Sequence, residues 1–331
     1  MKNATLRQLR VFATVARHLS FVRAAEELHL TPPAVSMQVK ELEREVGLPL
    51  FDRGKSVSLT VTGEYLLVHA RRMLAVLKDA EDQVARFKGL TGGRLVIGMV
   101  STAEYFLPRL LAQFRGDHPD VLVSLRVGSR EQLVGLMQRN EVDLAVMGRP
   151  PKDWASRAEP FAKHPHLLVT APDHPFTRMD HVPAALLARE PMIVREQGSG
   201  TRAALDEFLH EQRIELRPAM EMTSNETIKQ AVMAGLGVSL LSLHTIGLEV
   251  RHGLLATPEV EGLPVQRRWH VVATHGKQLS PAAEAFRYFV LERGEALLAA
   301  MFPEERAEAS ALVKARRRRR SPLKRSTPSS R

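Results

Sequence analysis

The chain has 331 residues, of which 44% are hydrophobic and 25% charged, as in an ordinary soluble globular protein. At roughly 100–200 residues per domain we expect two or three domains. The chain contains no cysteine, which excludes disulfides, thiolate zinc sites and cysteine nucleophiles. No stretch approaches the ~20 apolar residues of a membrane span or the apolar core of a signal peptide, so we expect a cytoplasmic protein without membrane contact.

The formal net charge of +10 is concentrated at the two ends of the chain. Residues 1–62 hold nine Lys or Arg against six Asp or Glu, and residues 303–331 hold ten against three. The tail, 303–331, has the composition of a disordered segment. It is either a solvated extension or a source of nonspecific affinity for nucleic-acid phosphates.

The first 62 residues predict a winged helix-turn-helix that reads DNA. Ser20 is placed to cap a second short helix, and Thr31 a third, with Pro32 at its first position where proline costs no hydrogen bond. The basic segment Asp52–Lys55 lies between two short strands and reads as a wing. The predicted DNA contacts are Thr31, Pro33, Ser36, Met37, Gln38 and Lys40 on the third helix, and Arg53 and Lys55 on the wing. A three-helix bundle with solvated charges is the alternative.

Residues 63–90 predict a linker helix, starting at a Thr62 cap. An apolar seam with 4–3 spacing favours a dimeric coiled coil, formed by Leu66, Ala70, Met73, Leu77, Ala80, Val84 and Phe87. A single amphipathic helix lying on its own domain is the alternative. In a dimer, two heads related by a two-fold axis would bind an interrupted inverted repeat in double-stranded DNA.

Residues 91–302 alternate between strand and helix patterns, which predicts an α/β body of two lobes with a mostly parallel sheet. Lobe I is assigned about 91–163 and 269–302, and lobe II about 164–268. Ligands of such folds bind at strand C-termini and helix N-termini. The candidate effector residues are Ser101, Thr102, Gly148, Arg149, Gly198, Ser199, Gly200, Thr201, Arg202, Thr223 and Asn225. They predict an anionic ligand, with Arg202 as a fixed cation; the serines and threonines are alternatively only helix caps.

Several strings resemble those of the LysR-type transcriptional regulators. In the head they are Leu9–Phe12, Ser20–Leu28, Pro33–Ser36 and Leu48–Arg53. In the body, Gly98–Phe106, Arg126–Glu131 and Asn140–Pro151 are similar to those of the Calvin-cycle (RuBisCO) operon regulators in this family. Pro32 and Met37 depart from the family, which usually has glutamine and often arginine there, so base contacts are expected to shift toward Gln38, Lys40 and the wing.

The resemblance implies a two-lobed effector domain like the type 2 periplasmic binding proteins, and control of carbon-fixation genes. It also implies a phosphorylated metabolite or NADPH as effector, no resident cofactor, a homodimer or homotetramer, and contact with RNA polymerase. Control of another metabolic operon is the alternative within the family. A solute-binding protein of the same fold is the alternative from another class, but it leaves residues 1–88 without a purpose.

An enzyme is not expected. Gly198–Gly200 lacks the spacing of a nucleophile elbow, and Gly235–Gly237 lacks the third glycine of a dinucleotide loop. His164 and His166 offer two ring ligands at most, so no metal site is expected.

Overall fold

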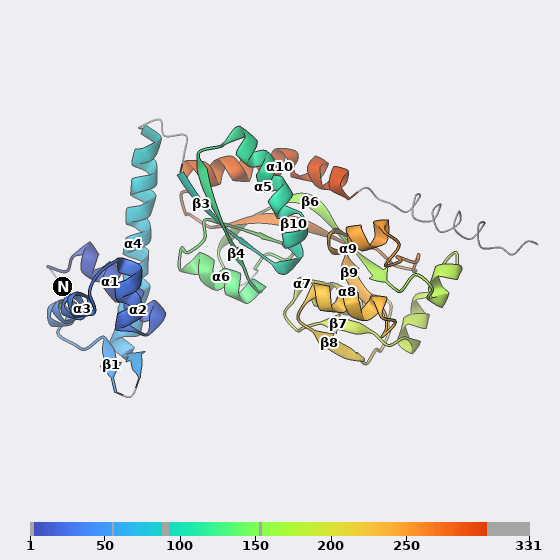
Figure 1. The fold of residues 1–331 in the computed structure, drawn as a ribbon, viewed down its shortest axis with the longest axis horizontal. Helices are drawn as coiled ribbons and strands as arrows, with labels where there is room; N and C mark the ends of the chain where they lie inside the picture. The colour runs from blue at the N-terminus through green and yellow to red at the C-terminus, as the bar shows by residue number, and fades with distance from the viewer. Residues whose placement is uncertain (1–2, 55, 88–92, 152–153, 303–331) are drawn as a thin grey trace, which may run out of the picture.

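The computed structural model describes residues 3–54, 56–87, 93–151 and 154–302 (Figure 1). Within them, a small helical head is joined by one long helix to a two-lobed α/β body. The predicted tail, 303–331, lies outside the described residues.

The head consists of three short helices followed by a hairpin: α1 (Leu6–His18), α2 (Phe21–Leu28), α3 (Pro32–Val46), β1 (Phe51–Arg53) and β2 (Val57–Leu59). Each helix starts at a capping hydroxyl, as predicted for the second and third, and Thr5, Ser20 and Thr31 each accept a hydrogen bond from the backbone N–H three residues on. Gly47 ends α3 with a φ of 80°, a left-handed conformation suited to glycine. Phe12 lies at the centre of the core of the head and is fully buried.

The linker helix α4 (Val61–Phe87) begins earlier than predicted, because Thr60 rather than Thr62 caps it. The Thr60 hydroxyl accepts from the N–H of Gly63 at 3.0 Å and donates to the carbonyl of Pro49 at 2.7 Å. The first turns of α4 belong to the head, since Leu66 and Ala70 are buried in its core. The rest of α4 extends away from the three head helices (Figure 1).

The body is organised around a six-stranded sheet in the order β4-β3-β5-β10-β6-β9. These strands are β3 (Gly93–Met99), β4 (Val121–Val127), β5 (Leu144–Met147), β6 (Ser156–Val169), β9 (Ser239–Ser242) and β10 (Val265–Thr274). Strands β3, β4 and β5 are parallel, as predicted, but β10 runs antiparallel to both β5 and β6. The expected mostly parallel sheet is therefore wrong for the half of the sheet that joins the two lobes.

Strand β6 contains two prolines, Pro160 and Pro165, which have no N–H to donate to a sheet ladder. The structure has one strand from Ser156 to Val169, paired with β10 from Val265 to Thr274. On its other side β6 pairs with β9 only from His166 onward, so both prolines lie where the strand has a single neighbour. Such edge positions tolerate a missing N–H donor.

Lobe I surrounds the β3 end of the sheet and lobe II the β9 end (Figure 1). Lobe I adds η1 (Ser101–Tyr105), α5 (Leu107–Asp117), α6 (Arg130–Gln138) and the closing helix α10 (Pro281–Met301). Lobe II adds η2 (Pro175–Arg178), η3 (Ala184–Arg189), β7 (Ile193–Arg195), α7 (Gly200–Glu211), β8 (Met220–Met222), α8 (Asn225–Met233) and α9 (Leu243–Arg251). Strands β7 and β8 pair in parallel, and α9 was not predicted.

Candidate DNA-binding surface and effector site

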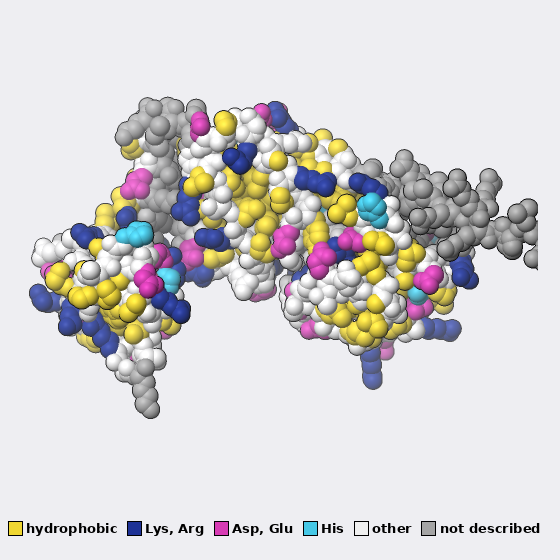
Figure 2. All heavy atoms as spheres, in the orientation of Figure 1, with side chains coloured by type: hydrophobic (Ala, Val, Ile, Leu, Met, Phe, Trp, Pro, Cys, Tyr) yellow, Lys and Arg dark blue, Asp and Glu magenta, His cyan; other side chains and the backbone are white. Residues whose placement is uncertain are grey.

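The outer face of α3 presents most of the residues predicted to contact DNA. Met37 is 53% exposed, Pro33 and Lys40 are exposed, and Ser36 is half-buried. The Thr31 side chain caps the helix by accepting from the N–H of Ala34 at 3.4 Å. Figure 2 shows Lys and Arg side chains gathered over the outer side of the head. This face combines a helix of groove-compatible size with positive charge, as a major-groove reader requires.

Gln38 is tied to its own domain in this structure. Its Nε2 donates to Oε2 of Glu41 at 3.2 Å, and Gln8 of α1 donates to the same oxygen at 3.1 Å. The carboxylate of Glu41 therefore links α3 to α1 through Gln8 and also holds the Gln38 amide, which would have to leave this contact to reach a base edge.

Arg53 also has a structural partner. Its guanidinium pairs with Glu43 at 3.1 Å and lies over the ring of Phe21 at 5.0 Å. The other oxygen of Glu43 accepts the backbone N–H groups of Leu50 and Phe51 at 2.9 and 3.3 Å. The predicted phosphate contact thus anchors the hairpin to α2 and α3. Lys55, the other predicted wing cation, lies outside the described residues.

The predicted seam on α4 divides into two parts. Leu66 and Ala70 are buried in the core of the head. Beyond them, Met73 is 38% and Val84 52% exposed, Ala80 is exposed and Leu77 half-buried. The side chain of Phe87 lies outside the described residues. The alternative of a helix lying on its own domain describes only the first turns; the rest of the seam is an apolar stripe whose described side chains are exposed or half-buried.

In lobe I, the predicted effector residues follow the ends of two neighbouring parallel strands. Ser101 and Thr102 open η1 after β3, and Gly148 and Arg149 follow β5. Thr102 is 6% exposed, and its hydroxyl has no hydrogen-bond partner among the described residues. A side chain at Gly148 is excluded by His164, because a Cβ there would lie 2.6 Å from the imidazole Nδ1.

In lobe II, the predicted loop precedes α7. Ser199 caps this helix by accepting from the N–H of Arg202 at 3.0 Å, and Thr201 is 5% exposed. Gly198 has a φ of 86° and lies against lobe I, since a Cβ there would be 3.4 Å from the Glu131 carboxylate. The loop therefore lies at the boundary between the lobes.

Arg202 does not offer the free cation that the sequence suggested. Its guanidinium pairs with Asp206 at 2.8 Å and Glu221 at 3.2 Å, and donates to the carbonyl of Arg195 at 3.2 Å. Gly200 is the first residue of α7.

Sequence reasoning missed Arg195, which is 6% exposed at the end of β7. It pairs with Glu196 and donates to Oδ1 of Asn225 at 2.6 Å. The contact fixes the orientation of the Asn225 amide, whose Nδ2 is buried without a hydrogen-bond partner among the described residues. Thr223 is exposed, and Ser224 rather than Thr223 caps α8. The signal that sequence reasoning overlooked was a cation, Arg195, at the end of a strand whose residues are all buried.

The two lobes are joined by a polar contact that sequence reasoning also missed. Tyr105 of η1 donates its hydroxyl to Glu226 of α8 at 2.6 Å. Lys229 pairs with Glu226 and with Glu249, and its ammonium lies 4.8 Å from the Tyr105 ring. Burial alone would raise the pKa of Glu226, but hydrogen bonds from Lys229 and Tyr105 outweigh it and lower that pKa. Burial and this carboxylate together raise the pKa of Tyr105, which keeps its proton and remains a donor.

Three buried histidines lie where the crossing strands pass between the lobes. His164 stacks on Trp269 at 3.9 Å between ring centroids and lies 4.3 Å from His166. His244 accepts from the Trp269 indole N–H at 3.1 Å and contacts Phe106 of lobe I. Burial is the main cause that lowers the pKa of all three histidines: that of His164 falls well below 6.5, that of His166 to about 3, and that of His244 to about 4. All three are therefore neutral at pH 7.

Both ring nitrogens of His164 and of His166 are buried without a hydrogen-bond partner in the part of the chain that the structure describes. No group of three or more His, Asp or Glu side chains in that part is arranged to hold a metal ion. No described helix is long and apolar enough to cross a membrane.

Comparison with known proteins identifies the class to which this head and body belong. A model of the bacterial regulatory helix-turn-helix proteins of the lysR family matches residues 6–64, and a model of the LysR substrate binding domain matches residues 88–295. The chain therefore belongs to the LysR family of transcriptional regulators. The predicted winged helix-turn-helix and two-lobed effector domain are confirmed, and the three-helix bundle and solute-binding alternatives are set aside.

Individual relatives are similar over most of the chain. The HTH-type transcriptional regulator CfxR of Cupriavidus necator is 49% identical, covering 88% of this chain and 92% of its own. The RuBisCO operon transcriptional regulator of Allochromatium vinosum is 48% identical, covering 87% of this chain and 96% of its own. The solved regulatory domain of CcmR from Synechocystis PCC6803, in complex with 2-PG, is 36% identical with a TM-score of 0.58, covering 64% of this chain and 98% of that domain.

Proposed function

We propose that this LysR-type regulator controls carbon-fixation (Calvin-cycle) genes and responds to a small anionic metabolite bound at the boundary between its lobes. The 48% identity to a RuBisCO operon regulator supports the target. The class of ligand is supported by the related CcmR domain, which was solved with 2-phosphoglycolate. A phosphorylated metabolite is therefore favoured over NADPH.

The observation that carries the ligand proposal is a buried polar donor without a partner at the lobe boundary. In lobe II the Asn225 Nδ2 donor is buried and unpaired among the described residues. Thr102 and Thr201, 6% and 5% exposed, add hydroxyl groups that can donate to the same ligand. A buried donor left unsatisfied costs about 1–3 kcal/mol, so a ligand or an ordered water is expected to accept from these groups.

Several of these groups suit an anion. The backbone N–H groups at the start of α7, next to Thr201, carry the positive end of the helix dipole. The Arg195 guanidinium donates to the amide oxygen of Asn225, which leaves the amide NH2 group of Asn225 free to donate to a ligand. Arg202 contributes by fixing the loop through Asp206 and Glu221 rather than by touching the ligand.

In this proposal the ligand regulates the protein by changing the relative position of the two lobes. A ligand that contacts both Thr102 in lobe I and Asn225 in lobe II favours the arrangement in which these residues lie close, as does the Tyr105–Glu226 hydrogen bond. The two lobes are connected by β6 and β10, so their relative position changes when these paired strands bend. The ligand can influence the DNA-binding heads only if it binds one arrangement of the lobes more tightly than the other.

The assembly proposed is a homodimer through the exposed seam of α4, with a homotetramer built from two such dimers. Two heads at a two-fold axis match an interrupted inverted repeat in a promoter, where RNA polymerase is a further partner. Acting on DNA, the protein works in the cytoplasm and is not an enzyme.

The test is operator binding by the full-length protein with and without 2-phosphoglycolate, on promoter DNA of a carboxylase operon. Thr102→Val is nearly isosteric and removes only the hydroxyl, so it should abolish the response to the metabolite while retaining basal DNA binding. The control, Thr274→Val, changes a half-buried threonine at the far end of β10 and should respond like the wild type. An unchanged response in Thr102→Val would show that the metabolite does not bind at Thr102. Sequence-specific binding only to another operon would show that the carboxylase operon is not the target.

A further inference from the structure

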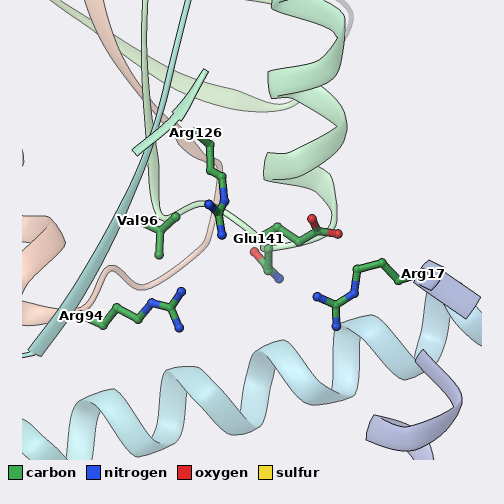
Figure 3. A pocket seen from close by; sticks show the side chains of 6 residues that line it. Arg17, Arg94, Val96, Arg126 and Glu141 are labelled. Carbon is green, nitrogen blue, oxygen red and sulfur yellow. The ribbon is translucent and has the colours of Figure 1, made fainter. Parts of the chain in front are cut away.

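A cavity of about 270 Å³ lies where the head meets lobe I, and none of its lining residues is one of the proposed effector residues (Figure 3). Arg17 comes from the last turn of α1 in the head, whereas Arg94 and Arg126 come from β3 and β4 of lobe I. The complete lining is Arg17, Arg94, Val96, Arg126, Asn140 and Glu141. The cavity is therefore shared between the DNA-binding domain and the sensor.

The two arginines of lobe I are directed into this space by strand register. In the parallel pair of β3 and β4, Arg94 lies opposite Leu122 and Arg126 opposite Gly98, so both arginines are on the same face of the sheet. Figure 3 shows both guanidinium groups reaching toward the space between the sheet and α4. Among the described residues, neither has a carboxylate partner. Two unpaired like charges aimed at one cavity repel each other, and an anion between them would remove that repulsion.

The charges around the cavity are unbalanced. Arg17 pairs with Glu27 at 2.9 Å, and Glu141, which lines the cavity, pairs with Arg139 at 2.8 Å. These two carboxylates therefore already have cationic partners. Neither is free to neutralise Arg94 or Arg126.

A further arginine, Arg71 on α4, also lies close to these positive charges. Burial is the main cause that lowers the pKa of Arg71; the nearby Arg139 and Arg17 lower it further, and Glu141 opposes them. Counting the groups already named, five arginines surround a region with two glutamates. The excess positive charge is a property of several elements, from both domains.

We propose that this cavity binds a small polyanion carrying phosphoryl groups, at a site distinct from the one between the lobes. The planar guanidinium group donates two parallel hydrogen bonds to phosphoryl oxygens, which suits Arg94 and Arg126 on one side and Arg17 on the other. The volume is just below the roughly 300 Å³ at which ligand pockets usually begin, so the occupant is the size of pyrophosphate or a small phosphorylated acid.

Such an anion links two domains that are otherwise joined through α4. It contacts Arg17 of the head together with Arg94 and Arg126 of lobe I, and so favours the relative position that brings these residues around one cavity. The concentration of the anion then biases the position of the head on the sensor independently of the ligand between the lobes.

The test is a calorimetric titration of the full-length protein with sodium pyrophosphate at constant ionic strength. In the double variant Arg94→Gln/Arg126→Gln two charge-assisted hydrogen-bond donors are lost, and we expect the Kd to rise on the order of 100-fold. The matched control is Arg115→Gln/Arg157→Gln, which removes the same charge from two exposed positions of lobe I and keeps the wild-type Kd. Thr102→Val, between the lobes, should also keep it.

Arg17→Gln, an exposed change in the head, should by itself raise the Kd about tenfold if the head takes part in binding. This variant also keeps the test decisive if the double variant fails to fold, which its far-ultraviolet circular dichroism would reveal. The proposal is overturned if wild-type protein gives no saturable heat, or if Arg17→Gln and the double variant both bind pyrophosphate as tightly as the wild type. A double variant that changes only the sedimentation coefficient would instead assign these arginines to a contact between copies of the chain.

Discussion

The buried histidines at the lobe boundary make the stability of the sensor depend on pH. In the unfolded chain their pKa is near 6.5, whereas in the folded sensor burial lowers the pKa of His166 to about 3 and of His244 to about 4, and lowers that of His164 as well. The unfolded state therefore binds more protons at mildly acidic pH. Stability contributed by these neutral rings is complete above pH 6.5 and is lost as the pH falls from 6.5 toward the folded values.

The magnitude follows from the pH interval. At pH 5.5, one unit below the unfolded pKa, each ring that stays neutral in the folded state lowers the free energy of unfolding by on the order of 1 kcal/mol relative to pH 7.5. His166→Phe removes one titrating ring and should reduce the loss by about 1 kcal/mol. The comparison is between two pH values for each variant, so a constant packing change caused by the phenylalanine cancels.

The assay is urea unfolding of the full-length protein at pH 7.5 and 5.5, followed by tryptophan fluorescence. Both tryptophans of the chain, Trp154 and Trp269, lie in the sensor, so the signal reports this domain. The control His275→Gln removes an exposed ring and should retain the wild-type pH difference. Equal losses of stability in wild type and His166→Phe would refute the reasoning.

Three further outcomes are expected. Lys40→Gln should weaken DNA binding, and where Lys40 neutralises a phosphate it should also reduce the slope of log K against log salt by about 0.9; an unchanged slope would remove Lys40 from the phosphate interface and leave it as a base contact. Tyr105→Phe removes a partly exposed bond to a carboxylate and should lower sensor stability by about 1 kcal/mol in urea; no change would show that the bond is not maintained in solution. Leu77→Glu should dissociate the dimer in sedimentation velocity while Val76→Glu, 67% exposed and off the seam, should not; a dimeric Leu77→Glu would place the interface elsewhere.

The head could be predicted nearly completely, because its structure is specified by local signals. Ser20 and Thr31 cap the helices they were expected to cap, and Gly47 ends α3. What could not be predicted was which polar side chains remain available. Arg53 and Gln38 looked like free surface groups, but Glu43 and Glu41 bind them from positions on α3 that periodicity alone assigns only to a partly exposed face.

The body was less predictable where long-range pairing overrides local preference. Pro160 and Pro165 lack the N–H donor of a strand, yet pairing with the whole of β10 holds them in β6. The candidate effector region shows the same limit: Ser101, Thr102 and Asn225 were proposed because strand ends and helix starts are visible in the sequence. Arg195 was not, because only the fold brings it against Asn225.

The most direct test of the central claim is a footprint of the full-length protein on the promoter region of a RuBisCO operon, with and without 2-phosphoglycolate. The account predicts protection of an interrupted inverted repeat at nanomolar protein, and a change in the protected pattern when the metabolite is added. Protection no stronger than on unrelated DNA of the same length, or a pattern indifferent to every phosphorylated metabolite tested, would contradict it.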